Sequence, residues 1–179
     1  MTQPEAVVLP WRHLRGYNCF GCSQDNPAGL HLQFERASEQ ELTCRFTLGR
    51  AHESYPNLIH GGIATTVLDE AMGNALGICR SRLCFTLSLR TRFIEPLRTA
   101  RTYRVRARID RASENLPVFR VESEITDLEG TVMVTGTGTY QTISVEQARS
   151  QIGDLPAAWA TDNGYLVTSR VDTAKRRAE

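Results

Sequence analysis

The sequence lacks any apolar run of 18 or more residues, so we do not expect a membrane-spanning helix. Its first residues also lack the basic start and the long apolar core of a secretory signal. Acidic and basic residues nearly cancel, and a formal net charge of +1 provides no general attraction to nucleic acid or to an anionic membrane. We therefore expect a cytoplasmic protein whose partners are neither membranes nor nucleic acids.

Cysteine is too scarce for a fold based on disulfides. The chain has 5 cysteines, an odd number, and reduced thiols are the expected state. Cys19 and Cys22 have the spacing of zinc and redox motifs, but a closed structural zinc site normally takes four protein ligands and a second pair is missing. A histidine could in principle complete such a site, but none stands at a spacing that requires it; the candidates are His13, His31, His52 and His60. We therefore expect no metal, and we interpret residues 19–22 as a turn whose small side chains pack under a sheet.

The length of 179 residues, with 41% hydrophobic residues, fits one globular domain with modest extensions. There is no internal repeat and no low-complexity segment. We divide the chain into an N-terminal arm at 1–18, a domain at 19–143 and a C-terminal extension at 144–179. Residues 145–152 have the pattern of a short helix, whereas 153–179 are irregular and are expected to be weakly ordered.

One long helical pattern begins near His60 or Gly61 and ends at about residues 77–80, with Gly77 as a plausible C-terminal signal. Gly73 and Gly77 weaken a helix interior, so we expect another element to approach there closely. The helix should be largely buried, because its small and apolar residues cover more than half of its circumference. These residues are Ile63, Ala64, Val67, Leu68, Ala71, Met72, Ala75 and Leu76.

Alternating patterns on both sides of this helix predict β-strands with one buried face. The predicted strands are 30–36 and 42–48, which form a hairpin, and then 85–96, 102–110, 118–126 and 131–143. The strand at 102–110 carries arginines on its outer face, and we expect them to pair with glutamates of 118–126. The predicted fold is α+β, with an antiparallel sheet wrapped around one long central helix.

Residues 18–143 resemble the hotdog-fold acyl-CoA thioesterases of the PaaI-like branch. The resemblance lies in Cys19-Phe-Gly-Cys22 with Asn26-Pro-Ala-Gly-Leu30, in His60-Gly-Gly62, in Leu68-Asp-Glu-Ala-Met-Gly73, and in the strand around Thr86-Leu-Ser-Leu89. It implies hydrolysis of a small, medium-chain or aryl acyl-CoA thioester to the free acid and CoA. It also implies a homodimer or a dimer of dimers, without a metal or a separate cofactor.

The start of the helix and its first acid are the candidate reactive groups. A helix N-terminus offers unpaired N–H groups, so the amide of Gly61 or Gly62 can polarise a carbonyl and hold an oxyanion. The resemblance assigns this role to Gly61. Asp69, about two turns further, is expected on a wall of the pocket whose floor is the helix start, as general base or nucleophile. Glu70 points about 100° away and is interpreted as a structural or interface carboxylate.

The remaining candidates come from the neighbouring segments. His60 is interpreted as shaping the loop before the glycines rather than as a proton-transfer group. By resemblance, Thr86 is a hydroxyl from a neighbouring subunit that helps to hold the attacking water. Ser54 stands where related enzymes often carry Asn or Gln, and Asn57 or His52 can substitute for that amide.

Two other functions remain open. Because Ser54 departs from the family pattern, a non-catalytic acyl-CoA-binding or regulatory hotdog module is the main alternative. A hotdog hydratase or dehydratase is the weaker one, since the sequence shows no Asp and His pair arranged for that chemistry.

Overall fold

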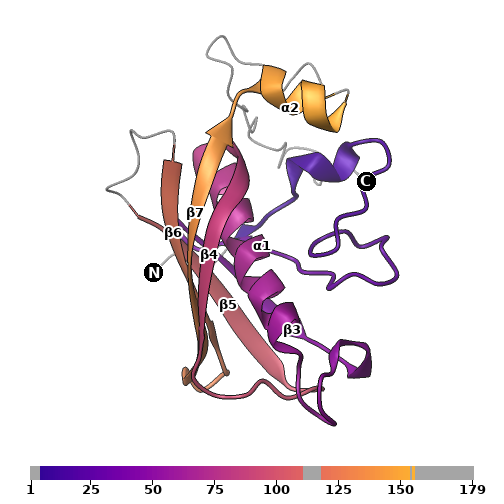
Figure 1. The fold of residues 1–179 in the computed structure, drawn as a ribbon, viewed down its shortest axis with the longest axis vertical. Coiled ribbons are helices and arrows are strands. Elements are labelled where there is room, and N and C mark those ends of the chain that lie inside the picture. Colours follow the sequence, from indigo (N-terminus) through magenta and orange to yellow (C-terminus); the bar gives the residue numbers. More distant parts are fainter. Residues whose placement is uncertain (1–4, 111–117, 154, 156–179) are drawn as a thin grey trace, which may run out of the picture.

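The longest element of the computed structural model is the helix α1, Gly61–Arg80, which begins at the predicted position (Figure 1). His60 is its N-cap, and Ser81, in the left-handed conformation with φ 53°, is its C-cap. Gly77 lies inside the helix, so its prediction as the C-terminal signal was wrong. The structure describes residues 5–110, 118–153 and 155. Within this part of the chain, no helix combines the length and the hydrophobicity that a membrane span requires.

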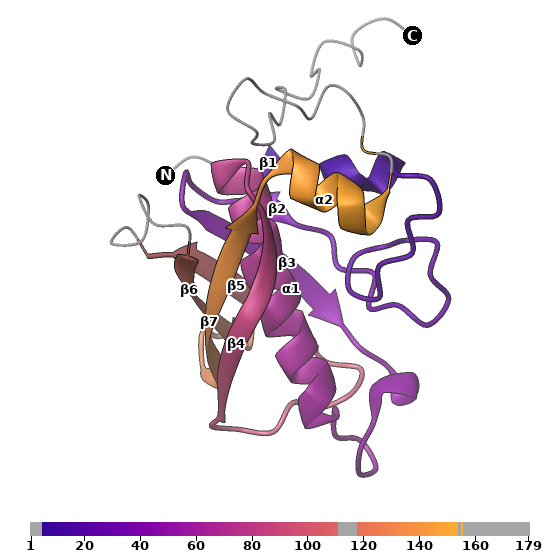
Figure 2. The ribbon, with the colours of Figure 1, turned by 45° about the horizontal axis from the view of Figure 1, so that its top comes forward.

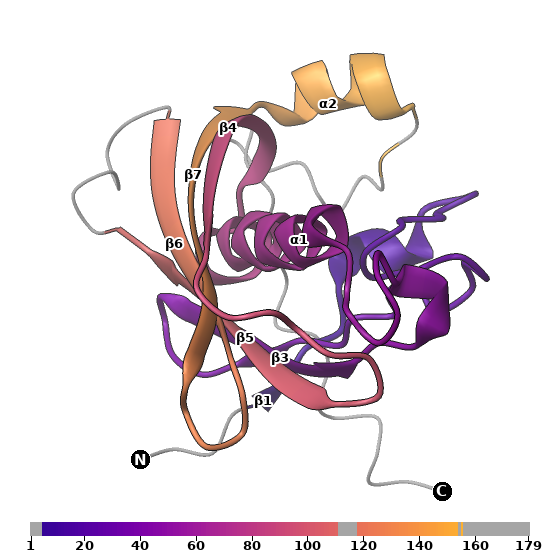
Figure 3. The same ribbon diagram turned by 60° about the horizontal axis from the view of Figure 1, so that its bottom comes forward.

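Seven strands form one antiparallel sheet in the order β1-β2-β3-β5-β6-β7-β4. Figures 1 and 3 show this sheet curving around α1, which confirms the predicted α+β arrangement. The strands are β1 Glu5–Ala6, β2 Glu35–Arg36, β3 Glu41–Thr47, β4 Leu83–Phe93, β5 Thr102–Ile109, β6 Val118–Thr126 and β7 Val132–Ile143. The short helices are the 3-10 helices η1 Pro10–His13 and η2 Arg50–His52, and the α-helix α2 Val145–Ile152.

The core lies between α1 and the concave face of the sheet. On β5 the predicted inward residues, such as Tyr103 and Val105, are at most 2% exposed. Val67 and Leu68 on α1 are fully buried. Burying one large apolar side chain contributes about 1.5–3 kcal/mol, so this contact between helix and sheet is the main source of stability.

The strand predicted at 30–36 is present only as β2. Leu30 and Leu32 are buried as expected, but their N–H groups donate to the carbonyl groups of Phe20 and Gly21 instead of joining a neighbouring strand. The alternation therefore indicated which side chains are buried rather than which backbone is paired in the sheet.

The two ends of the described chain pack on each other. The arm adds β1 to the sheet and places Trp11 of η1 against Gly77 of α1. The helix α2 has the predicted bounds and lies beside η1 (Figure 2). Its Ala148 belongs to a small apolar cluster against which Trp11 and Leu14 pack. The tail predicted at 153–179 lies almost entirely outside the described residues.

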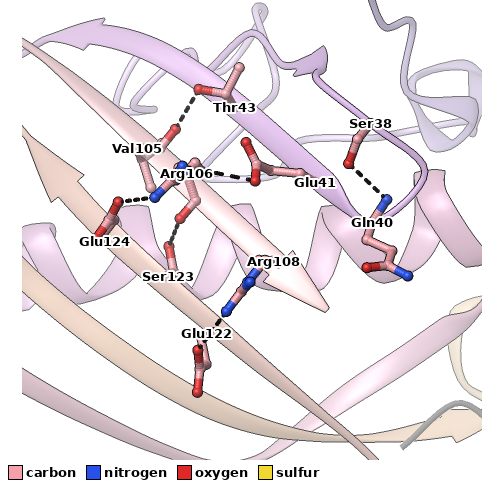
Figure 4. Close-up of polar contacts among 10 residues, drawn as sticks. All are labelled: Ser38, Gln40, Glu41, Thr43, Val105, Arg106, Arg108, Glu122, Ser123 and Glu124. Carbon is pink, nitrogen blue, oxygen red and sulfur yellow. Dashed lines mark hydrogen bonds and ion pairs between the residues drawn. The ribbon is translucent and has the colours of Figure 1, made fainter. Parts of the chain in front are cut away.

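The outer face of the sheet carries the predicted ion pairs between β5 and β6 (Figure 4). Arg106 lies 2.6 Å from Glu124, and Arg108 lies 3.7 Å from Glu122. These side chains are largely exposed, and such a pair contributes less than about 1 kcal/mol. The face is therefore a solvated surface that contributes little to the fold.

The two glycines of α1 should respond oppositely to alanine. A Cβ at Gly77 would lie 2.3 Å from Trp11, whereas a Cβ at Gly73 has Tyr140 as its nearest neighbour at 4.0 Å. We expect Gly77→Ala to lower the free energy of unfolding by about 1–3 kcal/mol because Trp11 must move. Gly73→Ala should raise it by up to about 1 kcal/mol through helix propensity. Urea unfolding followed by circular dichroism measures both, and equal stabilities would show that Trp11 does not pack on the helix.

Candidate functional site

Asp69 is held by two hydroxyl groups that come from the sheet. Its Oδ1 accepts a hydrogen bond of 2.8 Å from the Tyr140 hydroxyl and one of 3.0 Å from Thr86 Oγ1. Thr86 on β4 and Tyr140 on β7 are direct cross-strand partners. Among the described residues, Asp69 Oδ2 has no hydrogen-bond partner. The pair of strands thus fixes one oxygen of the carboxylate and leaves the other for chemistry.

The sheet is irregular next to this carboxylate. The register between β4 and β7 shifts between Thr86 and Ser88, so Leu87 is left out of the ladder. A β-bulge changes the direction of nearby side chains and is frequent beside active sites. The bulge directly follows Thr86, whose hydroxyl must point toward Asp69 to donate its hydrogen bond.

A hollow of about 240 Å³ contains Asp69, Thr86 and Tyr140, and Glu70 and Cys84 also line it. Ligand pockets for small molecules are usually about 300–1,000 Å³. The hollow of one chain therefore holds only part of a ligand as large as an acyl-CoA.

The neighbours of Asp69 keep their protons near neutral pH. Burial, followed by the nearby charge of Asp69, raises the pKa of the Tyr140 hydroxyl above its usual value. The same two causes raise the pKa of the Cys84 thiol to about 12. Tyr140 is thus a hydrogen-bond donor to the carboxylate, and Cys84 is a neutral wall rather than a thiolate nucleophile.

The start of α1 leaves one amide unused. The N–H of Gly62 donates to His60 Nδ1 over 2.9 Å, so the imidazole caps the helix and occupies that donor. The N–H groups of Ile63 and Ala64 donate to the His60 carbonyl. No partner for the Gly61 N–H is found among the residues that the structure describes. Of the two predicted oxyanion donors, Gly61 is therefore the available one.

Gly61 and Asp69 do not meet within one chain. They are eight residues apart on the same continuous helix, which at about 1.5 Å per residue separates them by about 12 Å along the axis. A single thioester carbonyl cannot contact both groups at that separation. The expectation that Asp69 lies on a wall of the pocket whose floor is the helix start stays a prediction, and it requires a group from a second chain. The resemblance assigned Thr86 to a neighbouring subunit. In the structure, the Thr86 hydroxyl contacts Asp69 of its own chain.

Ser54 and Asn57 belong to a tight turn before α1 and do not contact Asp69. Both the N–H and Oγ of Ser54 donate to the Leu58 carbonyl, over 2.9 Å and 3.5 Å. Asn57 has φ 65°, and its N–H donates to Glu53 Oε1 over 3.1 Å. Both residues are exposed.

Glu70 faces the N-terminal segment instead of the sheet. Its Oε1 accepts a hydrogen bond of 2.7 Å from Asn74 Nδ2 and lies 3.5 Å from Cys19 Sγ. Burial, and then the negative charge of Cys19, raises the pKa of Glu70 to about 7. The pKa of Cys19 is lowered to about 5, first by its hydrogen bond with Cys22 and further by the backbone N–H groups of Cys22 and Gly21. The two adjacent acids of α1 thus have separate surroundings.

Tyr140 is the partner of Asp69 that the sequence did not reveal. The pattern placed it on a strand, but its partnership with Thr86 depends on the register between two strands that are far apart in the chain. One local signal exists, because a Cβ at Gly138 would lie 2.4 Å from the Tyr140 ring. The glycine two residues earlier makes room for the ring that reaches Asp69.

Comparisons with known proteins agree with this fold. Residues 56–135 match the family model of the thioesterase superfamily. The match includes Gly61, Asp69 and Thr86 but ends before Tyr140. No protein of curated function matches the sequence significantly.

Several solved structures are similar to the chain at low sequence identity. A thioesterase superfamily protein has 20% identity and a TM-score of 0.64, and the match covers 69% of this chain and 62% of that protein. A hypothetical thioesterase from Streptococcus pneumoniae, solved with coenzyme A, has 15% identity and a TM-score of 0.57, with 62% and 87% covered. A putative thioesterase from Ralstonia eutropha, described as related to phenylacetic acid degradation, has 21% identity and a TM-score of 0.56, with 64% and 86% covered. Residues 56–135 thus match the thioesterase superfamily, on a chain with the hotdog fold that the resemblance predicted.

Proposed function

We propose that this chain is an acyl-CoA thioesterase that hydrolyses a small, medium-chain or aryl acyl-CoA to the free acid and CoA. The match to the thioesterase superfamily supports a thioester hydrolase. The main support for acyl-CoA hydrolysis is the arrangement of the Asp69 carboxylate. Thr86 and Tyr140 fix one of its oxygens, and the other has no partner among the described residues. A fold relative solved with coenzyme A supports CoA as the leaving group.

The proposed chemistry starts at the unpartnered oxygen of Asp69. As a general base, Oδ2 takes a proton from water while the water oxygen attacks the thioester carbonyl carbon. The Gly61 N–H stabilises the resulting oxyanion. Collapse breaks the C–S bond, and the proton on Asp69 passes to the CoA thiolate. As a nucleophile, Asp69 instead forms a mixed anhydride, which water then hydrolyses to the same products.

The separation between Gly61 and Asp69 requires a second chain for this chemistry. We place the carbonyl between Asp69 of one subunit and Gly61 of the partner subunit. A homodimer with two-fold symmetry contains two such composite sites, because the same surface is used by both copies. This arrangement also enlarges the hollow, which is small in one chain.

The strand β4 is the proposed contact surface. It is the edge strand of the sheet, and its exposed side chains include Phe85 at 40%, Leu87 at 54% and Phe93 at 55%. Exposed apolar residues on an unpaired edge mark an interaction surface. The strand also touches both parts of the site, because Thr86 binds Asp69 and Phe93 is the nearest neighbour of a Cβ placed at Gly61. A copy packed on β4 is therefore close to both reactive groups.

Replacement of the proposed base tests the activity itself. The wild-type protein should release thiol from at least one member of an acyl-CoA panel, and Asp69→Asn should reduce kcat by at least about 100-fold. Glu122→Gln, the same chemical change on the outer face of the sheet, should retain activity. Activity that survives Asp69→Asn would remove Asp69 from the mechanism. Saturable binding without turnover by the wild type would instead favour the non-catalytic module.

The oxyanion donor can be removed without a large change of shape. Gly61 is the first residue of α1 and follows His60 at φ −62° and ψ 135°, a conformation and position that suit proline. We expect Gly61→Pro, which lacks the N–H, to lower kcat about 100- to 1,000-fold. Gly61→Ala adds a Cβ at the same distance of 3.3 Å from Phe93 but keeps the donor, so it should be far more active. Equal activities of the two variants would exclude the Gly61 amide.

Mixing these variants tests the composite site. A dimer of one Asp69→Asn chain and one Gly61→Pro chain retains one site in which both groups are intact. If subunits reassort at random, the mixture should recover up to about a quarter of the wild-type activity, although each variant alone is nearly inactive. Mixed dimers isolated through two different affinity tags provide the measurement. Mixed dimers without activity would show that both groups act within one chain.

A further inference from the structure

The turn of residues 19–22 places two thiols beside the partly buried carboxylate of Glu70. Cys19 Sγ, Cys22 Sγ and a Glu70 oxygen all lie within 4.8 Å of one another. Within the described ranges, no other group of three or more His, Cys, Asp and Glu side chains converges in this way. No hydrogen bond joins this cluster to Asp69 among the described residues, although Glu70 also lines the hollow that contains Asp69. The proposed hydrolysis does not use the cluster.

We propose that Cys19, Cys22 and Glu70 bind one zinc ion, with water as the fourth ligand. Thiolate sulfur and carboxylate oxygen are both zinc ligands. Zn–S bonds of about 2.3 Å and Zn–O bonds of about 2.0 Å at tetrahedral angles separate sulfur and oxygen by about 3.5 Å. Cys19 Sγ lies 3.5 Å and 3.6 Å from the two oxygens of Glu70, which matches that edge of a tetrahedron.

Each proposed ligand also has a hydrogen-bond partner of its own. The Gly21 N–H donates to Cys19 Sγ over 3.3 Å, and the Tyr17 hydroxyl lies 2.7 Å from Cys22 Sγ. Asn74 Nδ2 donates to Glu70 Oε1 over 2.7 Å. Such outer partners orient the ligand atoms of metal sites and stabilise their deprotonated forms. These donors therefore suit anionic forms of Cys19 and Glu70, whereas the buried Cys22 thiol keeps its proton unless a cation compensates its charge.

The backbone of the turn at residues 19–22 lies directly against the Glu70 carboxylate. A Cβ at Gly21 would lie 2.4 Å from Glu70 Cδ, so any larger residue would displace the carboxylate from its present position. Cys22 is 6% exposed, and a second ionised group in such a place requires a compensating charge. A divalent cation supplies that charge and keeps Cys19, Cys22 and Glu70 together.

Zinc explains this cluster better than a disulfide does. A bond between Cys19 and Cys22 would use the two thiols but would give Glu70 no role. The sequence alone predicted no metal because it lacked a second pair of ligands, and the third ligand comes from α1, 48 residues after Cys22. The ion would attach the N-terminal segment to the helix at the residue that follows Asp69. This proposal does not depend on the thioesterase proposal.

Metal binding by the full chain tests the site directly. Protein purified under reducing conditions should contain up to one zinc per chain. After chelation and reloading, Co²⁺ should bind with the same stoichiometry and give the absorption bands of a tetrahedral cobalt thiolate, and added Zn²⁺ should remove them. These readouts need neither a variant nor enzymatic activity.

Substitutions then assign the ligands. Cys19→Ser, Cys22→Ser and Glu70→Gln should each weaken Co²⁺ binding by at least about 100-fold, and Tyr17→Phe by about 10- to 100-fold. Cys79→Ser is the matched control, because it removes a thiol outside the cluster and should not change binding.

Three results would overturn the site. The first is reduced wild-type protein that takes up neither Zn²⁺ nor Co²⁺. The second is binding that persists unchanged in Cys22→Ser. The third is a Cys19–Cys22 disulfide in fresh protein which, after reduction, still leaves the chain unable to bind metal.

Discussion

The burial of α1 inside the curved sheet is the constraint on which the structure depends. A helix that is covered on most sides can carry a polar side chain only where a neighbouring element supplies a partner. Asp69 meets this requirement with Tyr140 and Thr86 of the sheet. Glu70 meets it with Asn74 of the same helix and with the segment at residues 19–22. The same requirement thus produces two polar clusters at adjacent residues, with different neighbours and different proposed uses.

The strands of the sheet differ in their exposure to solvent from the middle of the sheet to its edge. The strands in its middle are covered by α1 on one face, while β4 at the edge is largely exposed. Thr86 of this strand contributes to the carboxylate site, and its neighbours Phe85 and Leu87 remain exposed apolar residues. Positioning a reactive group and presenting an apolar edge are therefore properties of one short segment. A substitution there would be expected to affect association and catalysis together.

The sequence predicted the elements that depend on local patterns. One buried face was predicted for the strand at 85–96, but no residue of β4 is buried. The bounds of α1 and α2, the inward rows of β3, β5 and β6, and the positions of Gly61 and Asp69 on the helix were readable, because periodicity and helix-end chemistry are local. The contact of Tyr140 with Asp69 was not, since it depends on which strands pair and in which register. Glu70 and Cys19 likewise meet across 51 residues. The sequence therefore did not predict which residues distant in the chain contact the polar side chains of α1.

The distance along α1 between Gly61 and Asp69 has a consequence beyond geometry. If the reactive groups come from two identical chains, an isolated chain has a complete fold but no complete site. Catalysis then follows mass action, because the concentration of sites depends on the concentration of dimers rather than of chains. Below the dissociation constant of the dimer, activity rises with about the square of the amount of protein. The cell would regulate such an enzyme by its abundance more steeply than one whose site lies within a single chain.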